Sequence, residues 1–184
     1  MTARARSAAI LHCHGDSPCT AVESIKSYLR LEPGGFVTVT YVLDGSADLL
    51  RVPLPKPARR VDGLWRHTCF EAFVAVKGTP NYYELNFSPS GEWAAYSFRS
   101  YRDGGALEND GLDPGIAVRR EERMLALSAV MRLDQLPGIA PEASLRLGLC
   151  AVIEDIDGGL SYWALKHLPG KPDFHHPDTF ILEI

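Results

Sequence analysis

Apolar and polar residues alternate along much of the chain, which is the period-two pattern of strands with two different faces. The cleanest example is Phe36–Leu43, FVTVTYVL, which is rich in the β-branched and aromatic residues that strands favour. In Tyr82–Ser88 the residues Tyr83, Leu85 and Phe87 alternate with a more polar set. Both stretches therefore predict strands that bury one face in a core.

The stretch Leu64–Arg102 shows this pattern most densely and predicts three strands joined by two short turns. Gly, Pro and Ser interrupt the apolar runs at Lys77–Pro80 and at Ser90–Gly91, so we place the turns there. We expect this three-stranded antiparallel unit to form the centre of the fold.

Shorter runs of the same kind fill the rest of the chain. Val22–Leu31 fits a helix or a strand, and the strand is favoured because unambiguous strands follow it. Glu121–Glu122 and Asp157–Gly159 mark hairpin turns. Further strands are expected at Ser7–Cys13 (as an edge strand), Ile116–Arg120, Arg123–Leu133, Leu145–Ile156, Leu160–Leu165 and Thr179–Ile184, with loops at Ala47–Gly63, Asp103–Pro114 and His167–Asp178.

The fold class follows from the number and spacing of these strands. No window of sufficient length carries a convincing helical stripe, and turn signals recur at intervals of roughly 8–12 residues. This pattern predicts an all-β fold, an antiparallel β-sandwich of the jelly-roll or immunoglobulin-like type. With 184 residues, 46% of them hydrophobic, residues 1–184 are expected to form one domain with a single core.

Charge and composition exclude several kinds of partner. The net charge is −4 and no long basic run is present, so binding to nucleic acid is not expected. No run approaches the roughly 18 apolar residues of a membrane span. The N-terminal apolar stretch is interrupted at His12 and His14, too early for a signal-peptide core. We therefore expect a cytoplasmic protein without a membrane partner, whose four scattered cysteines need no disulfide.

The predicted register gathers polar side chains on one face of the central strands. Pairing across the first turn places Glu71 opposite Asn86. With the second turn at Ser90–Gly91, Trp93 and Arg99 join the same face. The predicted patch comprises Glu71, Glu84, Asn86, Ser88, Trp93 and Arg99, and the reverse side, expected to be core, comprises Phe70, Ala72, Val74, Tyr83, Leu85, Phe87, Ala94, Tyr96 and Phe98.

This patch has the groups that bind a polyhydroxylated ligand, because carboxylates and amides bond to sugar hydroxyls and a Trp ring stacks on a pyranose. Two alternatives remain. The face could be an ordinary solvated one, with a surface ion pair between Glu84 and Arg99. It could also hold the two carboxylates of a glycoside hydrolase, Glu71 and Glu84. Glu71 lies between Cys69 and Phe73 on its own face, and a carboxylate among apolar neighbours needs a partner or a function.

Two adjacent histidines, His175 and His176, could ligate a metal together with His167 or Asp173. Adjacent residues of an extended segment point to opposite sides, so only one of the two can face a given site. We therefore predict no metal site, and the sequence indicates no particular cofactor.

Three blocks of the sequence, LWRHTCFEAFV, YYELNFSPSGEWAAYSFRSYR and YWALKHLPGKPDFHH, together resemble the bacterial DOMON-like proteins, which are related to family 9 carbohydrate-binding modules. The resemblance extends from about Val22 to the C-terminus. It implies a sugar cleft on this sheet, with aromatic rings sandwiching the sugar. The implied site residues are Glu71, Glu84, Asn86 and Arg99 at the polar positions and Trp65, Trp93 or Trp163 as the stacking platform.

The wider DOMON superfamily includes haem-binding domains, whose iron is held by Met and His or by two His. This sequence departs from that pattern, because Met124 and Met131 lie on opposite faces of one predicted strand. The sequence therefore predicts a non-catalytic domain that binds a small polar ligand, a saccharide or sugar-containing metabolite, in the concave face of the central sheet. A haem-binding or redox domain is the alternative, and a glycan-acting enzyme comes after it. The oligomeric state is not indicated.

Overall fold

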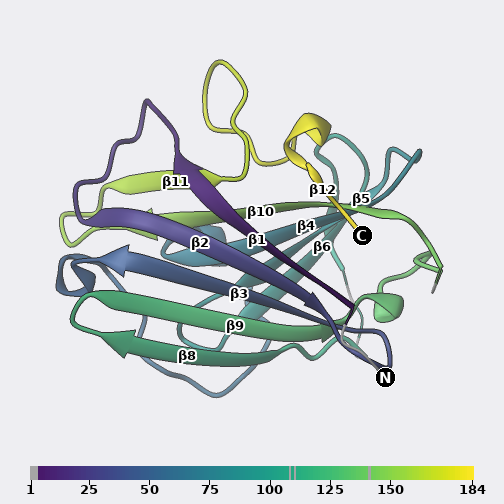
Figure 1. Cartoon of the computed structure of the whole chain (residues 1–184), viewed down its shortest axis with the longest axis horizontal. Helices are drawn as coiled ribbons and strands as arrows, with labels where there is room; N and C mark the ends of the chain where they lie inside the picture. The colour runs from purple at the N-terminus through teal and green to yellow at the C-terminus, as the bar shows by residue number, and fades with distance from the viewer. Residues whose placement is uncertain (1–3, 108, 110, 141) are drawn as a thin grey trace.

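The computed structural model of the chain describes residues 4–107, 109, 111–140 and 142–184 (Figure 1). Its named strands pair antiparallel throughout, and the described residues contain no α-helix. One sheet has the order β1 (Arg4–Cys13), β2 (Val22–Leu31), β3 (Phe36–Gly45), β9 (Met124–Arg132) and β8 (Gly115–Glu121). The other has the order β7 (Asp103–Ala106), β6 (Trp93–Ser100), β5 (Tyr82–Phe87), β4 (Cys69–Val76), β10 (Leu145–Glu154) and β11 (Leu160–Ala164), with β12 (Leu182–Glu183) beside β10. The predicted antiparallel β-sandwich is confirmed.

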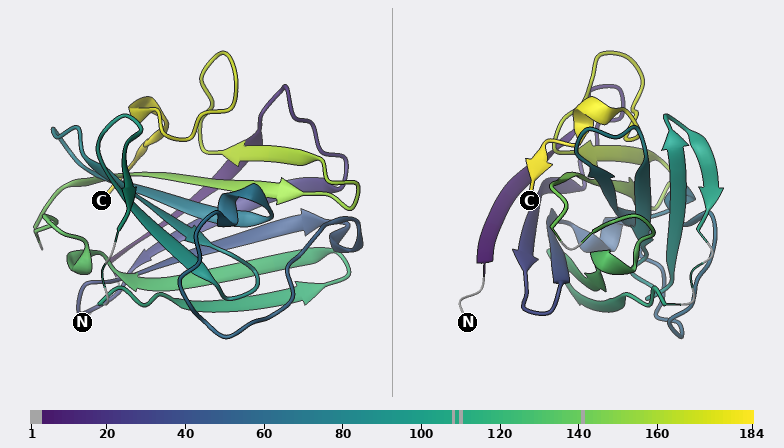
Figure 2. Two further views of the ribbon diagram at one scale, coloured as in Figure 1. Left: turned by 180° about the vertical axis from the view of Figure 1, so that it is seen from behind. Right: turned by 90° about the vertical axis from the view of Figure 1, so that its right-hand side faces the viewer.

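The main core lies between the two sheets, which face each other in the end-on view of Figure 2. Burial alternates along β3 as the sequence pattern predicts, because only one face of that strand meets the opposite sheet. Tyr41 of β3 is completely buried and packs on Phe70 of β4, with 5.0 Å between the ring centroids. Its hydroxyl donates a 2.6 Å hydrogen bond to the backbone carbonyl of Glu71. This bond ties the two sheets together directly behind Glu71.

Strand β1 is an edge strand up to Leu11, as expected for Ser7–Cys13, and its last two residues connect the two sheets. The strand pairs with β2 along most of its length, and its last two residues, His12 and Cys13, pair with Ala164 and Trp163 of β11. Pairing with β11 uses the backbone groups of these two residues, so β1 is not a free edge at this end.

Most other predicted elements are present, with two corrections. Val22–Leu31 is a strand, and the hairpins β8–β9 and β10–β11 turn where the sequence places them. The segment Asp103–Pro114, expected as a loop, begins with the strand β7, which pairs with β6. The final strand predicted at Thr179–Ile184 is shorter, because a 3₁₀ turn occupies Pro177–Thr179 and the strand β12 comprises Leu182–Glu183.

The C-terminal segment builds a second, smaller apolar cluster on the outer face of the β4–β5–β10 strands. Phe180 stacks on Phe73 of β4 with 5.5 Å between the ring centroids, and it is 2% exposed. Gly148 of β10 lies beneath this ring, where a Cβ atom would come within 2.7 Å of Phe180 Cδ1. The C-terminal segment can therefore pack closely against β10 because residue 148 has no side chain.

Gly148→Ala is expected to destabilise the protein by about 1–3 kcal/mol, the usual cost of overpacking a filled site. The added methyl group must displace Phe180 from its stack on Phe73. Urea unfolding measures the change. Gly115→Ala in β8 is the matched control, because a Cβ atom there meets no atom within 4 Å. Equal stability of the two variants would contradict the prediction.

The long proline-containing loop between β3 and β4 is fixed by two buried carboxylates. Glu92 bonds Lys56 and Arg59 at 3.0 Å each, and Glu154 bonds Arg51 at 3.0 Å. As predicted, the loop is irregular over most of its length. It ends in a short 3₁₀ turn, Leu64–Arg66, which contacts β4 and β5. None of the described helical turns is long and apolar enough to cross a membrane.

Candidate ligand-binding pocket

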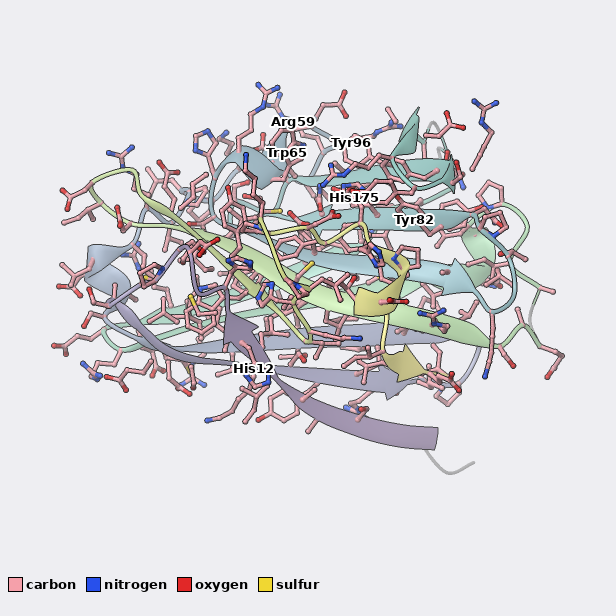
Figure 3. All side chains as sticks on the ribbon, turned by 90° about the horizontal axis from the view of Figure 1, so that it is seen from above. His12, Arg59, Trp65, Tyr82, Tyr96 and His175 are labelled. Carbon is pink, nitrogen blue, oxygen red and sulfur yellow. The ribbon has the colours of Figure 1, made fainter. Side chains whose placement is uncertain are left out.

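A pocket of about 410 Å³ opens on the outer face of the sheet, away from the main core. Its floor is formed by β4, β5 and β6, and its walls by the Leu64–Arg66 turn and by the segment that follows β11. In Figure 3, Trp65, Tyr96, His175 and Tyr82 gather over these strands, whereas His12 lies on the other side of the molecule. The volume is within the range of roughly 300–1,000 Å³ typical of ligand pockets.

Two buried carboxyls, those of Glu71 and Glu84, line the floor. Glu71 of β4 pairs in register with Asn86 of β5, and Glu84 pairs with Phe73, so the two glutamates are diagonal neighbours on one face. Only 2% of Glu71 and 5% of Glu84 is exposed. The prediction that Glu71 lies opposite Asn86 is confirmed.

Burial changes the protonation of both carboxyls. It raises the pKa of Glu71 well above its ordinary value, and the neighbouring charge of Glu84 raises that pKa further, against a weaker opposing effect of the Cys150 thiol. Burial also raises the pKa of Glu84, although the hydrogen bond from Asn86 and the charge of Arg102 oppose the rise. Glu71 therefore keeps its proton at pH values where an exposed glutamate is ionised.

The two carboxyls differ in their hydrogen bonds. Glu84 Oε1 accepts a 2.9 Å bond from Asn86 Nδ2. Glu71 Oε2 lies 3.8 Å from the Cys150 thiol, and Glu71 Oε1 is buried without a hydrogen-bond partner among the residues that the structure describes. A buried polar atom without a partner is costly, so Glu71, which lines the pocket, has unused capacity to accept a hydrogen bond.

His175 reaches the pocket from the segment after β11 and lies against Glu84. Its Nδ1 is 2.9 Å from the hydroxyl of Tyr82, and that hydroxyl accepts a bond from the backbone N–H of Arg102. The Tyr82 proton is thus available to Nδ1, which leaves the proton of a neutral His175 on Nε2, 3.5 Å from Glu84 Oε2. Burial lowers the pKa of His175 to about 4, Arg102 lowers it as well, and Asp173 opposes them. The ring is therefore neutral at pH 7.

Arg102 supplies the guanidinium of the pocket and is already engaged. It pairs with Asp173 at 2.8 Å and donates to the Tyr101 hydroxyl, which itself donates to Asp173. These contacts also hold the segment that carries His175 against the turn after β6. Arg102 thus closes the pocket wall.

Aromatic rings form most of the remaining lining. Six of them, from the floor and both walls, face the pocket: Trp65, Phe73, Tyr96, Phe98, Tyr162 and Phe174. Trp65 lies at the rim, where 46% of it is exposed and the Arg66 guanidinium lies 5.2 Å from its ring centroid. Such flat apolar surfaces beside fixed polar groups fit a ligand with both apolar and polar faces.

The register of β6 differs from the prediction, and this corrects the places of Trp93 and Arg99. Phe87 pairs with Trp93, and Ser88 N–H bonds to the Glu92 carbonyl, so three residues, with Gly91 at φ +90°, form the turn instead of two. One extra residue exchanges the two faces of the strand. Trp93 lies in the main core, whereas Tyr96 and Phe98, expected in the core, line the pocket.

Besides Trp93, the predicted residues Arg99, Trp163 and Ser88 lie outside the pocket lining. Arg99 is exposed and pairs with Asp103 at 3.1 Å, so the alternative in which it forms a surface ion pair with Glu84 is wrong. Trp163 is in the main core, where its Nε1 donates to Ser161. Ser88 Oγ accepts a bond from Ser90 within the turn. Of the predicted site residues, the structure brings together Glu71, Glu84 and Trp65 in the lining, with Asn86 bonded to Glu84.

Sequence reasoning missed six residues of the lining: Tyr96 and Phe98 of β6, and Arg102, Tyr162, Phe174 and His175. The argument that only one of His175 and His176 can face a site agrees with the structure, in which His175 alone lines the pocket. Among the described residues, no group of three or more His, Cys, Asp or Glu is placed to hold a metal ion.

Comparison with known proteins adds one observation. No family model matches the chain, and no relative was found among curated proteins. The chain resembles a solved crystal structure from Bacteroides uniformis, described as that of a "putative carbohydrate-binding protein", with a TM-score of 0.65 and 13% sequence identity. The likeness covers 96% of this chain and 84% of that one. At this identity the comparison establishes a shared fold.

Proposed function

We propose that the chain is a DOMON-like domain, related to family 9 carbohydrate-binding modules, and that its pocket binds a saccharide or a sugar-containing metabolite without chemistry. The proposal rests on one observation: two buried carboxyls and six aromatic rings line the same cavity of about 410 Å³. The fold shared with a protein described as a "putative carbohydrate-binding protein" supports it.

The pocket's groups match the two kinds of surface that a sugar presents. Ring hydroxyls bond to carboxyls and amides, and Glu71 Oε1 is free among the described residues to accept such a bond. The C–H face of a pyranose packs on an aromatic ring, and Trp65 and Tyr96 offer rings at the rim and on the floor. Binding to a single sugar ring is expected to be weak, because few groups are engaged and water competes for the hydroxyls.

The haem-binding alternative has less support from the pocket. Its lining contains one histidine, His175, whose Nδ1 is bonded to Tyr82. Met131 is in the main core, and Met124 lies in the hairpin of the opposite sheet. An axial pair for iron is therefore not assembled among the described residues of the lining. A Soret band in protein purified from haem-supplied cells would favour the haem-binding role instead.

Titration with a panel of mono- and disaccharides is expected to quench the tryptophan fluorescence. The signal should come from Trp65, because Trp93 and Trp163 are buried in the main core. Trp65→Phe should remove most of the quenching but retain binding by calorimetry. Trp65→Ala should weaken binding roughly three- to tenfold, the loss of one stacking contact.

Tyr28→Ala is the matched control for the titration. Tyr28 is an exposed aromatic residue of the opposite sheet, 40% exposed, and its removal should leave the sugar affinity unchanged. Absence of binding to every sugar of the panel by calorimetry would overturn the proposed function. Equal weakening by Tyr28→Ala and Trp65→Ala would place the sugar elsewhere than in the pocket and would count against it too.

A further inference from the structure

Two carboxyls line the pocket, and its one charged basic group, Arg102, is already paired. Glu71 is faced by Glu84 from β5, by Cys150 from β10 and by Cys69 of its own strand. Glu84 is faced by Asn86, by the neutral His175 and by Arg102. The Arg102 guanidinium is bound to Asp173. Within the described lining, no cation is therefore available to compensate both carboxyls.

One of the two carboxyls also lacks a hydrogen-bond partner. Glu71 is 2% exposed, lines the pocket, and has its Oε1 without a partner among the described residues. A buried carboxyl group needs either a proton or a cation close by. Since no described residue supplies a partner to Oε1 and Glu71 lines the pocket, the partner can come from a ligand.

We propose that the preferred ligand is an amino sugar, whose protonated amine binds between Glu71 and Glu84 while its ring packs on the aromatic lining. This inference rests on the proposed function and names the substrate class of the same pocket.

The aromatic lining supports a cation at this position. Phe73 of β4 pairs in register with Glu84, and Tyr96 of β6 also pairs with Glu84, so aromatic residues lie on both sides of that carboxyl. Ring faces attract a cation through their quadrupoles, and the attraction increases when water is excluded. A neutral hydroxyl could also donate to Glu71 Oε1, but only a cation stabilises the charged forms of both carboxyls. The arrangement therefore favours an ammonium group over a hydroxyl group.

Binding of an ammonium group should release a proton. Before binding, Glu71 holds its proton because the charged form is buried beside Glu84. The cation stabilises both carboxylates, so the proton leaves Glu71 for the solvent and the ligand amine keeps its own. The affinity for an amino sugar should therefore rise as the pH increases from 5 to 7. The affinity for a neutral sugar should not rise over the same range.

Calorimetric titration of the full chain tests the inference with three matched groups of ligands: glucosamine, galactosamine and mannosamine, their N-acetyl derivatives, and the parent hexoses. At least one amino sugar should bind ten or more times tighter than its parent hexose and its N-acetyl derivative at pH 7. Titration in two buffers of different ionisation enthalpy should show protons released on binding of that amino sugar.

Glu71→Gln, which keeps the shape of the side chain, should reduce the preference for the amine at least tenfold and abolish proton release. Glu183→Gln is the control, because Glu183 is an exposed carboxylate paired with Lys77 outside the pocket. Circular dichroism checks that each variant is folded, and Glu84→Gln provides a second test should Glu71→Gln not fold.

The outcomes separate this inference from the proposed function. Parent hexoses that bind as tightly as the amino sugars, or N-acetyl derivatives that bind best, would overturn the amino-sugar inference and leave sugar binding standing. An amine preference without proton release, or one that survives in both glutamine variants, would also overturn it. Absence of binding to any of these sugars or to the wider panel would overturn both.

Discussion

Glu71→Leu is expected to make the protein more stable and, at the same time, to weaken ligand binding at least tenfold. Glu71 is a buried carboxyl whose Oε1 lacks a partner among the described residues, and its near neighbours include the buried thiol of Cys150. Leucine fills a similar volume without a group that needs solvation. The expected gain at pH 7 is about 1–3 kcal/mol, the cost of leaving a buried polar group unsatisfied.

The gain from Glu71→Leu should depend on pH. Because the pKa of Glu71 is raised in the folded protein, the folded state holds this proton above the ordinary carboxyl pKa while the unfolded state loses it. The unfolded state then binds fewer protons, so the stability of the native protein falls as the pH rises from that value up to the folded pKa. The maximum slope for one such group is about 1.4 kcal/mol per pH unit.

Urea unfolding of both proteins at pH 5, 6, 7 and 8 measures this difference, and calorimetry with the best ligand of the panel measures the binding. The advantage of Glu71→Leu should grow with pH between the ordinary carboxyl pKa and the raised one. Glu71→Gln should lose the same pH dependence while keeping a polar side chain. A Glu71→Leu variant that is less stable than the native protein at every pH would contradict the expectation.

Tyr41→Ala is expected to cost about 3–5 kcal/mol of stability, the range for removing a buried aromatic ring. Tyr41 is completely buried, packs on Phe70 and bonds the Glu71 backbone carbonyl on the opposite sheet. Its removal leaves a cavity between the sheets and a carbonyl with one partner fewer. Thermal and urea unfolding should both show the loss.

Tyr41→Phe separates the ring from the hydroxyl. It keeps the packing on Phe70 and removes only the 2.6 Å hydrogen bond, so it should cost about 0.5–1.5 kcal/mol. Tyr28→Ala, on an exposed face, should change the stability by no more than about 0.5 kcal/mol. If Tyr41→Phe costs as much as Tyr41→Ala, the hydroxyl and not the ring dominates, contrary to the structure.

The sequence predicted the strands well, because most of them bury one face and therefore show period-two alternation. The first central turn was placed well enough to bring Glu71 opposite Asn86. The second was not, since Ser88–Glu92 contains several turn-forming residues and does not specify whether two or three form the turn. That difference of one residue moved Tyr96 and Phe98 from the expected core to the pocket.

The pocket walls could not be predicted from local pattern. His175 contacts Tyr82 across 93 positions of sequence, and Arg102 reaches Asp173 across 71. His175, Arg102 and Asp173 lie in turns and irregular segments, where no periodicity indicates which side a residue faces. Their positions depend instead on tertiary contacts, such as the packing of Phe180 above Gly148.

The wall segment that carries Pro172, Phe174 and His175 has a consequence for how this fold could change over evolution. Residues 165–176 include no strand, and side-chain contacts such as Arg102–Asp173 hold them in place, whereas the carboxyls and most of the rings are fixed on the sheet. Substitutions in this segment can change the shape of the ligand site without disturbing the backbone hydrogen bonds between the strands. Mutations in this segment can therefore change which ligand is bound while the chain still folds. Exchanging the segment between distant relatives is a direct way to exchange their ligand preferences.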